Sequence, residues 1–184
     1  MNFLNQDDTI CALSTSAGMG AIALIRLSGK DSIRIIEKIF SKSLADKTTH
    51  TAHFGYLKDE GELIDEVVVT LFKNPSSFTG QDSVEIACHG SVYIQEQILS
   101  ILIKHGARMA GPGEFSMRAF MNGKMDLSQT EAVADLISSS SAAAHKVAMH
   151  QMRGGFSKEI NELREGLLPR PAIVDDRQIQ HPLH

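Results

Sequence analysis

A single arginine stands inside an otherwise apolar stretch and is the first residue that could do chemistry. Arg26 interrupts the run Ala-Ile-Ala-Leu-Ile-Arg-Leu at residues 21–27. An unpaired guanidinium in such a run would be too costly to bury, so Arg26 needs an anionic partner. That partner could be a bound anion, which Arg26 would clamp, or a carboxylate of the chain in a structural salt bridge. The run alone leaves both readings open.

Two further charged residues could contact a ligand. Glu85 lies in Ser-Val-Glu-Ile-Ala-Cys, where strand alternation puts Val84 and Ile86 on one side and Glu85 on the other. A carboxylate beside small residues suits a pocket floor, because it accepts two parallel hydrogen bonds; the alternative is a solvated outer face. Lys124 lies in Asn-Gly-Lys-Met-Asp, where its flexible ammonium could reach an anionic ligand or be an ordinary exposed lysine.

Two kinds of glycine motif resemble nucleotide sites but lack essential parts. Residues 18–23 match the GxGxxA form of the dinucleotide fingerprint, which requires a helix directly after the glycines. Here an apolar run of strand character follows, so we interpret these glycines as a connection between strands. Gly29-Lys30 and Gly123-Lys124 lack the preceding glycine and the following Ser or Thr of a phosphate loop. We therefore expect no GTP binding by this chain alone.

The cysteines and histidines predict neither a metal site nor a catalytic residue. The eight histidines form no HxxxH pattern, and Cys88 and His89 are adjacent rather than at metal-ligand spacing. Cys88 is predicted to be a buried small residue, with a nucleophilic role as the alternative. Two cysteines, Cys11 and Cys88, indicate free thiols in a reducing compartment.

The composition is that of an ordinary globular chain. It has 184 residues, 42% of them hydrophobic and 22% charged, with a net charge of −4. The negative charge argues against a fold built mainly to hold nucleic acid. Neither a signal peptide nor a run of about 20 apolar residues is present, so we predict a cytoplasmic protein with no membrane partner.

The candidate residues require an α+β framework followed by a helical arm. A helix after Asp31, with that residue as its cap, and a second helix over Val92–Lys104 are predicted among the strands. Gly106 is predicted to end the second helix in a left-handed conformation. The predicted strands cover residues 9–14, 21–27, 51–57, 64–72, 82–88 and 107–110.

Beyond Pro112 the pattern is helical. A short helix is predicted from Pro112 to Phe120. Ser128 and Glu131 are predicted to form a capping box. A long amphipathic pattern follows to about residue 167, weakened by the serines at 138–141 and by Gly154–Gly155, with a bend as the alternative to a straight helix. The predicted domains are an N-terminal ligand-binding and dimerisation domain over 1–120, the start of a helical domain over 121–168, and an unstructured tail over 169–184.

Several blocks in order resemble the family of tRNA-modification GTPases called MnmE or TrmE. The similarity runs from Asp8 to about Leu168. Its blocks are Asp8-Thr-Ile-Cys-Ala-Leu-Ser, Gly20-Ala-Ile-Ala-Leu-Ile-Arg-Leu-Ser-Gly29, Asn74-Pro-Ser-Ser-Phe-Thr-Gly-Gln-Asp82, Val84-Glu-Ile-Ala-Cys-His-Gly90 and the continuous stretch from Gly111 to Ile137.

The resemblance implies a homodimer formed through the N-terminal domain, which is similar to the folate-binding domain of glycine-cleavage aminomethyltransferases. It implies a 5-formyltetrahydrofolate site near the dimer interface, contacted at Arg26, Glu85 and Lys124. Glu85 suits the adjacent N–H donors of a pterin, and the carboxylates of the folate tail suit Arg26 or Lys124. Which cation meets which group stays open.

The resemblance also implies a reaction. The full protein works with an FAD-dependent partner, MnmG, and installs an aminomethyl or carboxymethylaminomethyl group on C5 of the wobble uridine of certain tRNAs. Folate supplies the one-carbon unit. GTP hydrolysis, which depends on potassium and magnesium, drives rearrangement of the complex.

This chain departs from the family pattern in three respects: the GTPase module, the C-terminal cysteine motif and the helical continuation after residue 168 are missing from it. We therefore expect a fragment that binds folate and dimerises but does not hydrolyse GTP. The alternatives are a dimerisation scaffold without useful folate affinity, a stand-alone folate-dependent aminomethyltransferase, and a tRNA-binding module, against which the net charge argues.

Overall fold

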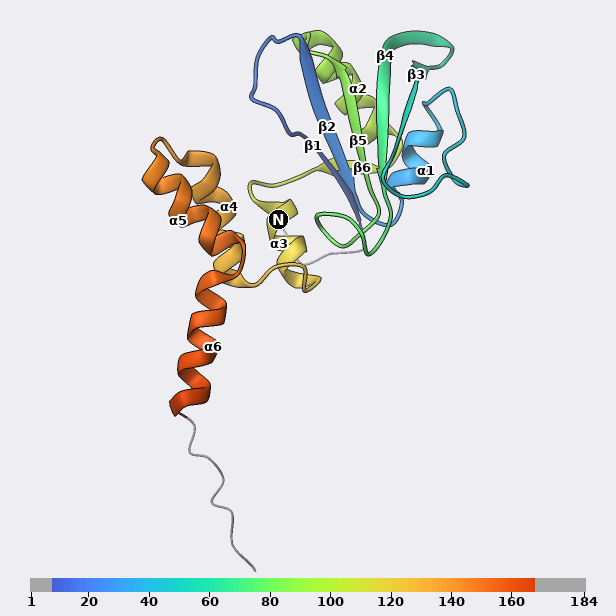
Figure 1. Cartoon of the computed structure of the whole chain (residues 1–184). Coiled ribbons are helices and arrows are strands. Elements are labelled where there is room, and N and C mark those ends of the chain that lie inside the picture. The colour runs from blue at the N-terminus through green and yellow to red at the C-terminus, as the bar shows by residue number, and fades with distance from the viewer. Residues whose placement is uncertain (1–7, 168–184) are drawn as a thin grey trace, which may run out of the picture.

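A computed structural model describes residues 8–167 as one sheet with flanking helices, followed by a helical arm (Figure 1). The strand order is β3-β4-β5-β2-β1-β6. All neighbouring strands are antiparallel except β1 and β6, which are parallel. The α+β prediction is confirmed. The strands are β1 (Thr9–Leu13), β2 (Ile22–Ser28), β3 (Thr51–Asp59), β4 (Glu62–Phe72), β5 (Ser83–His89) and β6 (Ala107–Met109).

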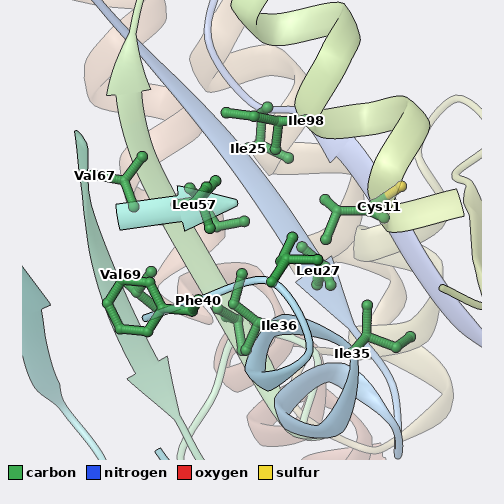
Figure 2. Packing of buried hydrophobic residues seen from close by; sticks show 14 of the residues in the cluster. Cys11, Ile25, Leu27, Ile35, Ile36, Phe40, Leu57, Val67, Val69 and Ile98 are labelled. Carbon is green, nitrogen blue, oxygen red and sulfur yellow. The ribbon is translucent and has the colours of Figure 1, made fainter. Parts of the chain in front are cut away.

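The main hydrophobic core lies between the sheet and two helices, α1 (Ser32–Glu37) and α2 (Val92–Lys104). Strand alternation directs Ile25 and Leu27 of β2 into this core, where both are fully buried. Figure 2 shows the side chains of α1 and α2 meeting those of the strands. The prediction for α2 matches its observed bounds, and Gly106 has the expected positive φ of 111°.

The opposite face of the sheet carries the charged candidates and is covered at one end only. Ser28, at the end of β2, is fully buried beneath the loop over residues 73–82, and α3 (Glu114–Met121) lies nearby. At the other end Ile22 is 69% exposed and Val68 of β4 is 38% exposed. This half-covered face, called the open face below, gives Arg26 and Glu85 access to solvent.

The helical arm corrects one sequence prediction. The single long pattern is divided into α4 (Leu127–Ser138), α5 (Ala142–Met152) and α6 (Gly155–Leu167). Helices α4 and α5 pack together and run in opposite directions. The side chain of Gln129, near the start of α4, donates to the backbone oxygen of Met152, at the end of α5. The chain therefore breaks at the weakened serine segment, where a bend was the predicted alternative, and it forms a hairpin there rather than a single long helix (Figure 1).

The predicted capping box is also misplaced. Asp126, not Ser128, caps α4: its carboxylate accepts the N–H of Gln129 at 2.8 Å, and the Gln129 side chain accepts the N–H of Asp126 at 2.9 Å. The helix begins at Leu127, so Ser128 already lies inside it and cannot take the cap position.

Of two smaller predictions about helix starts, one was wrong and the other is confirmed for the cap position only. Helix α3 begins at Glu114 rather than at Pro112, because Gly113 adopts a left-handed φ of 71°. Asp31 does occupy the cap position of α1, but its side chain makes no capping hydrogen bond and instead pairs with Arg34 at 3.0 Å.

No helix within the described residues is long and apolar enough to cross a membrane. The predicted tail at 169–184 lies outside the described residues. The predicted division of the chain after residue 120 remains a prediction.

Candidate ligand-binding site

Arg26 and Glu85 face each other directly across the pair of strands β2 and β5. Both Nε and Nη2 of Arg26 donate to Glu85 Oε1, at 3.0 and 2.7 Å. The side chains are 25% and 22% exposed, so the pair is open to solvent on one side. No donor among the described residues bonds to Oε2 of Glu85. The carboxylate therefore keeps acceptor capacity for another molecule.

Two aromatic rings flank the arginine of this pair. The Cζ atom of Arg26 lies 5.5 Å from the ring centroid of Phe78 and 5.7 Å from that of Phe115. Both distances fall within the range in which a ring quadrupole attracts a cation. Both phenylalanines are half-buried, so their rings border the ion pair and also face solvent.

A network of hydroxyl and amide groups positions the loop that carries Phe78. Ser28 at the end of β2 bonds to Thr79 Oγ1 at 2.6 Å, and Asn122 donates to Thr79 O at 2.7 Å. Ser77 donates to Gln81 O across the loop at 2.5 Å. The loop is thereby fixed to the sheet on one side and to the end of α3 on the other.

Lys124 lies in the connection between α3 and α4, and its side chain contacts the loop over residues 73–82 rather than the ion pair. Its Nζ donates to Pro75 O at 3.0 Å. Its stem crosses Gly80, where an added Cβ would lie 3.1 Å from Lys124 Cγ. The structure therefore brings Arg26 and Glu85 into contact and holds the side chain of Lys124 against the loop that carries Phe78.

A buried charge network that the sequence analysis missed positions α3, and with it Phe115. Glu114 and Arg118 are 2% and 1% exposed and bond to each other at 3.0 Å. Arg108 of β6 donates to both oxygens of Glu114, at 2.8 and 2.6 Å. Asp8 accepts from both arginines.

The network keeps Glu114 ionised although it is buried. Burial by itself raises the pKa of a carboxyl, but hydrogen bonds from Arg108, from the amide of Gly111 and from Arg118 outweigh burial and lower the pKa of Glu114 to about 2. In the sequence, the only local signal for the Glu114–Arg118 pair was the spacing of an acid and a base four residues apart. The same spacing is typical of an exposed helix surface.

The remaining candidates have structural explanations. Cys88 is 3% exposed, and burial followed by the charge of Asp65 raises the pKa of its thiol to about 11. Its interpretation as a buried small residue is confirmed. His89, the next residue, bonds through Nδ1 to Asp65 at 2.6 Å, a partner that the sequence analysis did not identify.

The glycines of the dinucleotide-like motif connect β1 to β2, as the sequence predicted. An added Cβ at Gly90 would lie 2.3 Å from Gly20 O, so close backbone approach explains a glycine there. A strand follows Gly20 rather than a helix, so the motif has no helix N-terminus for a pyrophosphate.

Comparison with known proteins gives matches along nearly the whole chain. Residues 9–124 match the family model described as "GTP-binding protein TrmE N-terminus", and residues 127–175 match the "MnmE helical domain". Proteins named tRNA modification GTPase MnmE are 53% identical in Flavobacterium johnsoniae and 56% identical in Cytophaga hutchinsonii, over 94% and 93% of this chain. The matched part spans only 38% and 37% of those relatives.

Proposed function

Because this chain belongs to the TrmE/MnmE family, with its N-terminal domain and helical domain, we propose that it is the ligand-binding part of a tRNA modification GTPase. In this proposal it binds 5-formyltetrahydrofolate as a one-carbon donor. The chain spans under two fifths of the relatives that carry this name, and in this proposal the GTPase activity belongs to the part that the chain does not match.

The observation that supports folate binding is the free side of the Glu85 carboxylate. Arg26 occupies Oε1 only, and the rings of Phe78 and Phe115 lie beside the Arg26 guanidinium. A pterin presents an amino group and a ring N–H side by side, and a carboxylate accepts such a donor pair well. Aromatic borders suit the flat faces of the same ring.

In the full protein this site would supply carbon for aminomethyl or carboxymethylaminomethyl modification at C5 of the tRNA wobble uridine. An FAD-dependent partner of the MnmG type would take part in the reaction, in the cytoplasm. GTP, magnesium and potassium would act in the GTPase module. The part proposed for the present chain is to hold the folate within a homodimer.

Calorimetric titration of the purified chain with 5-formyltetrahydrofolate tests the proposal, with GTP as the control ligand. Folate should bind and GTP should not, since the sequence has no phosphate loop. Glu85→Gln should weaken folate binding by about 1.5–3 kcal/mol, the usual value of a hydrogen bond to a charged group.

Glu66→Gln is the matched control, because Glu66 is an exposed glutamate on the neighbouring strand β4. It should leave folate affinity unchanged. Absence of folate binding in a folded protein would reject the proposed ligand, and equal effects of the two substitutions would remove Glu85 from the site.

A dimerisation scaffold is the second candidate, favoured by apolar side chains on the open face. Phe54 is 51% exposed and Tyr56 38%, and their rings meet edge to face at 5.8 Å. Val68, opposite Phe54, is 38% exposed. Sedimentation equilibrium together with the titration separates the candidates, because a scaffold alone would dimerise without binding folate.

A further inference from the structure

One helix of the arm carries cations and no carboxylate. Helix α5 and its C-cap contain Lys146 and Arg153, and both side chains are exposed. The only charged residues of α4, which packs against α5, are the acids Glu131 and Asp135. Among residues 8–167, no ion pair involves Lys146 or Arg153. The described part of the chain therefore leaves the positive charge of α5 without a partner.

These cations lie on the side of α5 that faces away from α4. The side toward α4 is fixed by contacts, since Ala148 is buried and Gln151 donates to a backbone oxygen of α4 at 3.1 Å. Lys146 lies two residues before Ala148, and Arg153 lies two residues after Gln151. Two residues turn an α-helix by about 200°, so both cations point to the opposite side. His150, four residues after Lys146 and three before Arg153, completes one line along the helix, called the basic stripe below.

The basic stripe suits the phosphate groups of a nucleic acid. Seven residues separate its two cations, which places them about 10 Å apart along the helix axis. His150 lies between them, and its imidazole ring, which packs edge to face against Phe156 at 5.8 Å, offers an N–H donor. Lysine and arginine on a helix surface are the residues that hold a phosphate backbone. A lipid surface would require apolar side chains in the stripe, and it has none.

We propose that the basic stripe of α5 contacts the phosphate backbone of the tRNA. This inference rests on the proposed function and deepens it, because tRNA is the substrate there and the folate site gives no surface that holds it. The net charge of −4 does not oppose this contact. Two exposed charges interact with a phosphate according to their local surroundings, and acids farther away than about 10 Å are largely screened by salt.

Fluorescence anisotropy of an end-labelled tRNA transcript, titrated with the purified chain, tests the contact. Lys146→Gln combined with Arg153→Gln should weaken binding about tenfold, the effect of losing two exposed ion pairs. The slope of log affinity against log salt concentration should also fall by about 2, one for each lost phosphate contact. An unchanged affinity and slope would overturn the proposal.

The matched control is Lys158→Gln combined with Arg164→Gln on α6, which changes the net charge equally. These cations lie in a helix that also carries three glutamates, and Lys158 is 3.9 Å from Glu162. The control should change tRNA affinity less than about twofold, because these charges are already balanced nearby. An equal loss in both double variants would reduce the effect to net charge and overturn the assignment to α5.

A third variant keeps the test decisive if the double variant does not fold. Ala142 is exposed at the first position of α5, four residues before Lys146. Ala142→Glu places a carboxylate where it pairs with Lys146, and a negative charge at a helix start also stabilises the helix. It should weaken tRNA binding about threefold without lowering the melting temperature. Ala142→Gln, its uncharged counterpart, should bind tRNA as the unmodified chain does.

The outcomes separate this inference from the folate proposal. Folate binding without tRNA binding would reject the basic stripe and leave the folate site standing. Binding of tRNA that depends on Lys146 and Arg153, without folate binding, would reject the folate site and keep the stripe. Polyglutamate added at equal charge concentration tests for an acidic protein partner instead. If it displaces the tRNA, the stripe binds any polyanion and the assignment to RNA is overturned.

Discussion

The carboxylate of Glu114 pairs with two arginines and so compensates the buried positive charge next to α3. It lies between the guanidinium groups of Arg108 and Arg118, at 2.6 and 3.0 Å. Glu114→Gln should lower the free energy of unfolding by about 3–5 kcal/mol, because it removes one partner of a buried ion pair and leaves Arg118 incompletely compensated. Urea denaturation measures this loss. Glu131→Gln, on the exposed side of α4, is the control and should change little.

The same carboxylate predicts how stability depends on pH. Its pKa is lowered from 4.5 to about 2 in the folded chain. A group with a depressed folded pKa stabilises the fold fully above its unfolded pKa and loses that contribution as the pH falls toward the folded value. The urea midpoint should therefore fall between about pH 4.5 and pH 2, and it should fall less steeply in Glu114→Gln. Equal slopes in both proteins would contradict this role.

Sequence reasoning found some of these residues and missed others for a physical reason. Arg26 and Glu85 were identified because a charge within an apolar strand is unusual. Their contact depends on the register between β2 and β5, which joins residues 59 positions apart and is not encoded in either strand alone. Glu114 and Arg118 were missed because an acid and a base one helical turn apart look the same on exposed and buried helices.

At the scale of elements, the caps decide where the helices of the arm begin and end. Asp126→Ala should lower the free energy of unfolding of the arm by about 1–2 kcal/mol, since Asp126 accepts the N–H of Gln129 and also contacts Ser157. Ser128→Ala, at the position favoured by the sequence pattern, should change it by less than about 0.5 kcal/mol. Thermal melts followed by circular dichroism compare the two, and the reverse ranking would contradict the observed cap.

The serine run shows why the hairpin was not predicted. The apolar spacing continues in phase on both sides of residues 138–141, so periodicity alone favours one helix. Ser139 Oγ bonds to Leu136 O at the end of α4, and Ser141 Oγ accepts the N–H of Ala144 at the start of α5. Serine side chains thus replace the backbone bonds of a continuing helix, and the chain turns back. Packing between α4 and α5 then stabilises the turn, and packing is not a local property.

At the scale of the whole molecule, the apolar core of the sheet domain is buried, whereas the apolar side chains of the last helix of the arm, α6, are exposed. The sheet and its helices enclose a continuous core, whereas α6 presents Phe156, Ile160 and Leu163 at 38%, 61% and 67% exposure. Their spacing of four and three residues is that of one apolar helix face. The chain spans under two fifths of the length of these relatives.

This difference predicts uneven protection from hydrogen exchange. Amides of β2, β5 and α2 should exchange only by global unfolding, because those elements surround the core. Amides of α6 should exchange at least about a hundredfold faster, since an isolated helix of this length is marginal in water. Mass spectrometry of exchange at two protein concentrations measures both. Protection of α6 that rises with concentration would mean that a second copy covers its apolar face. Protection equal to that of the strands at the lower concentration would mean that contacts within one chain stabilise the arm.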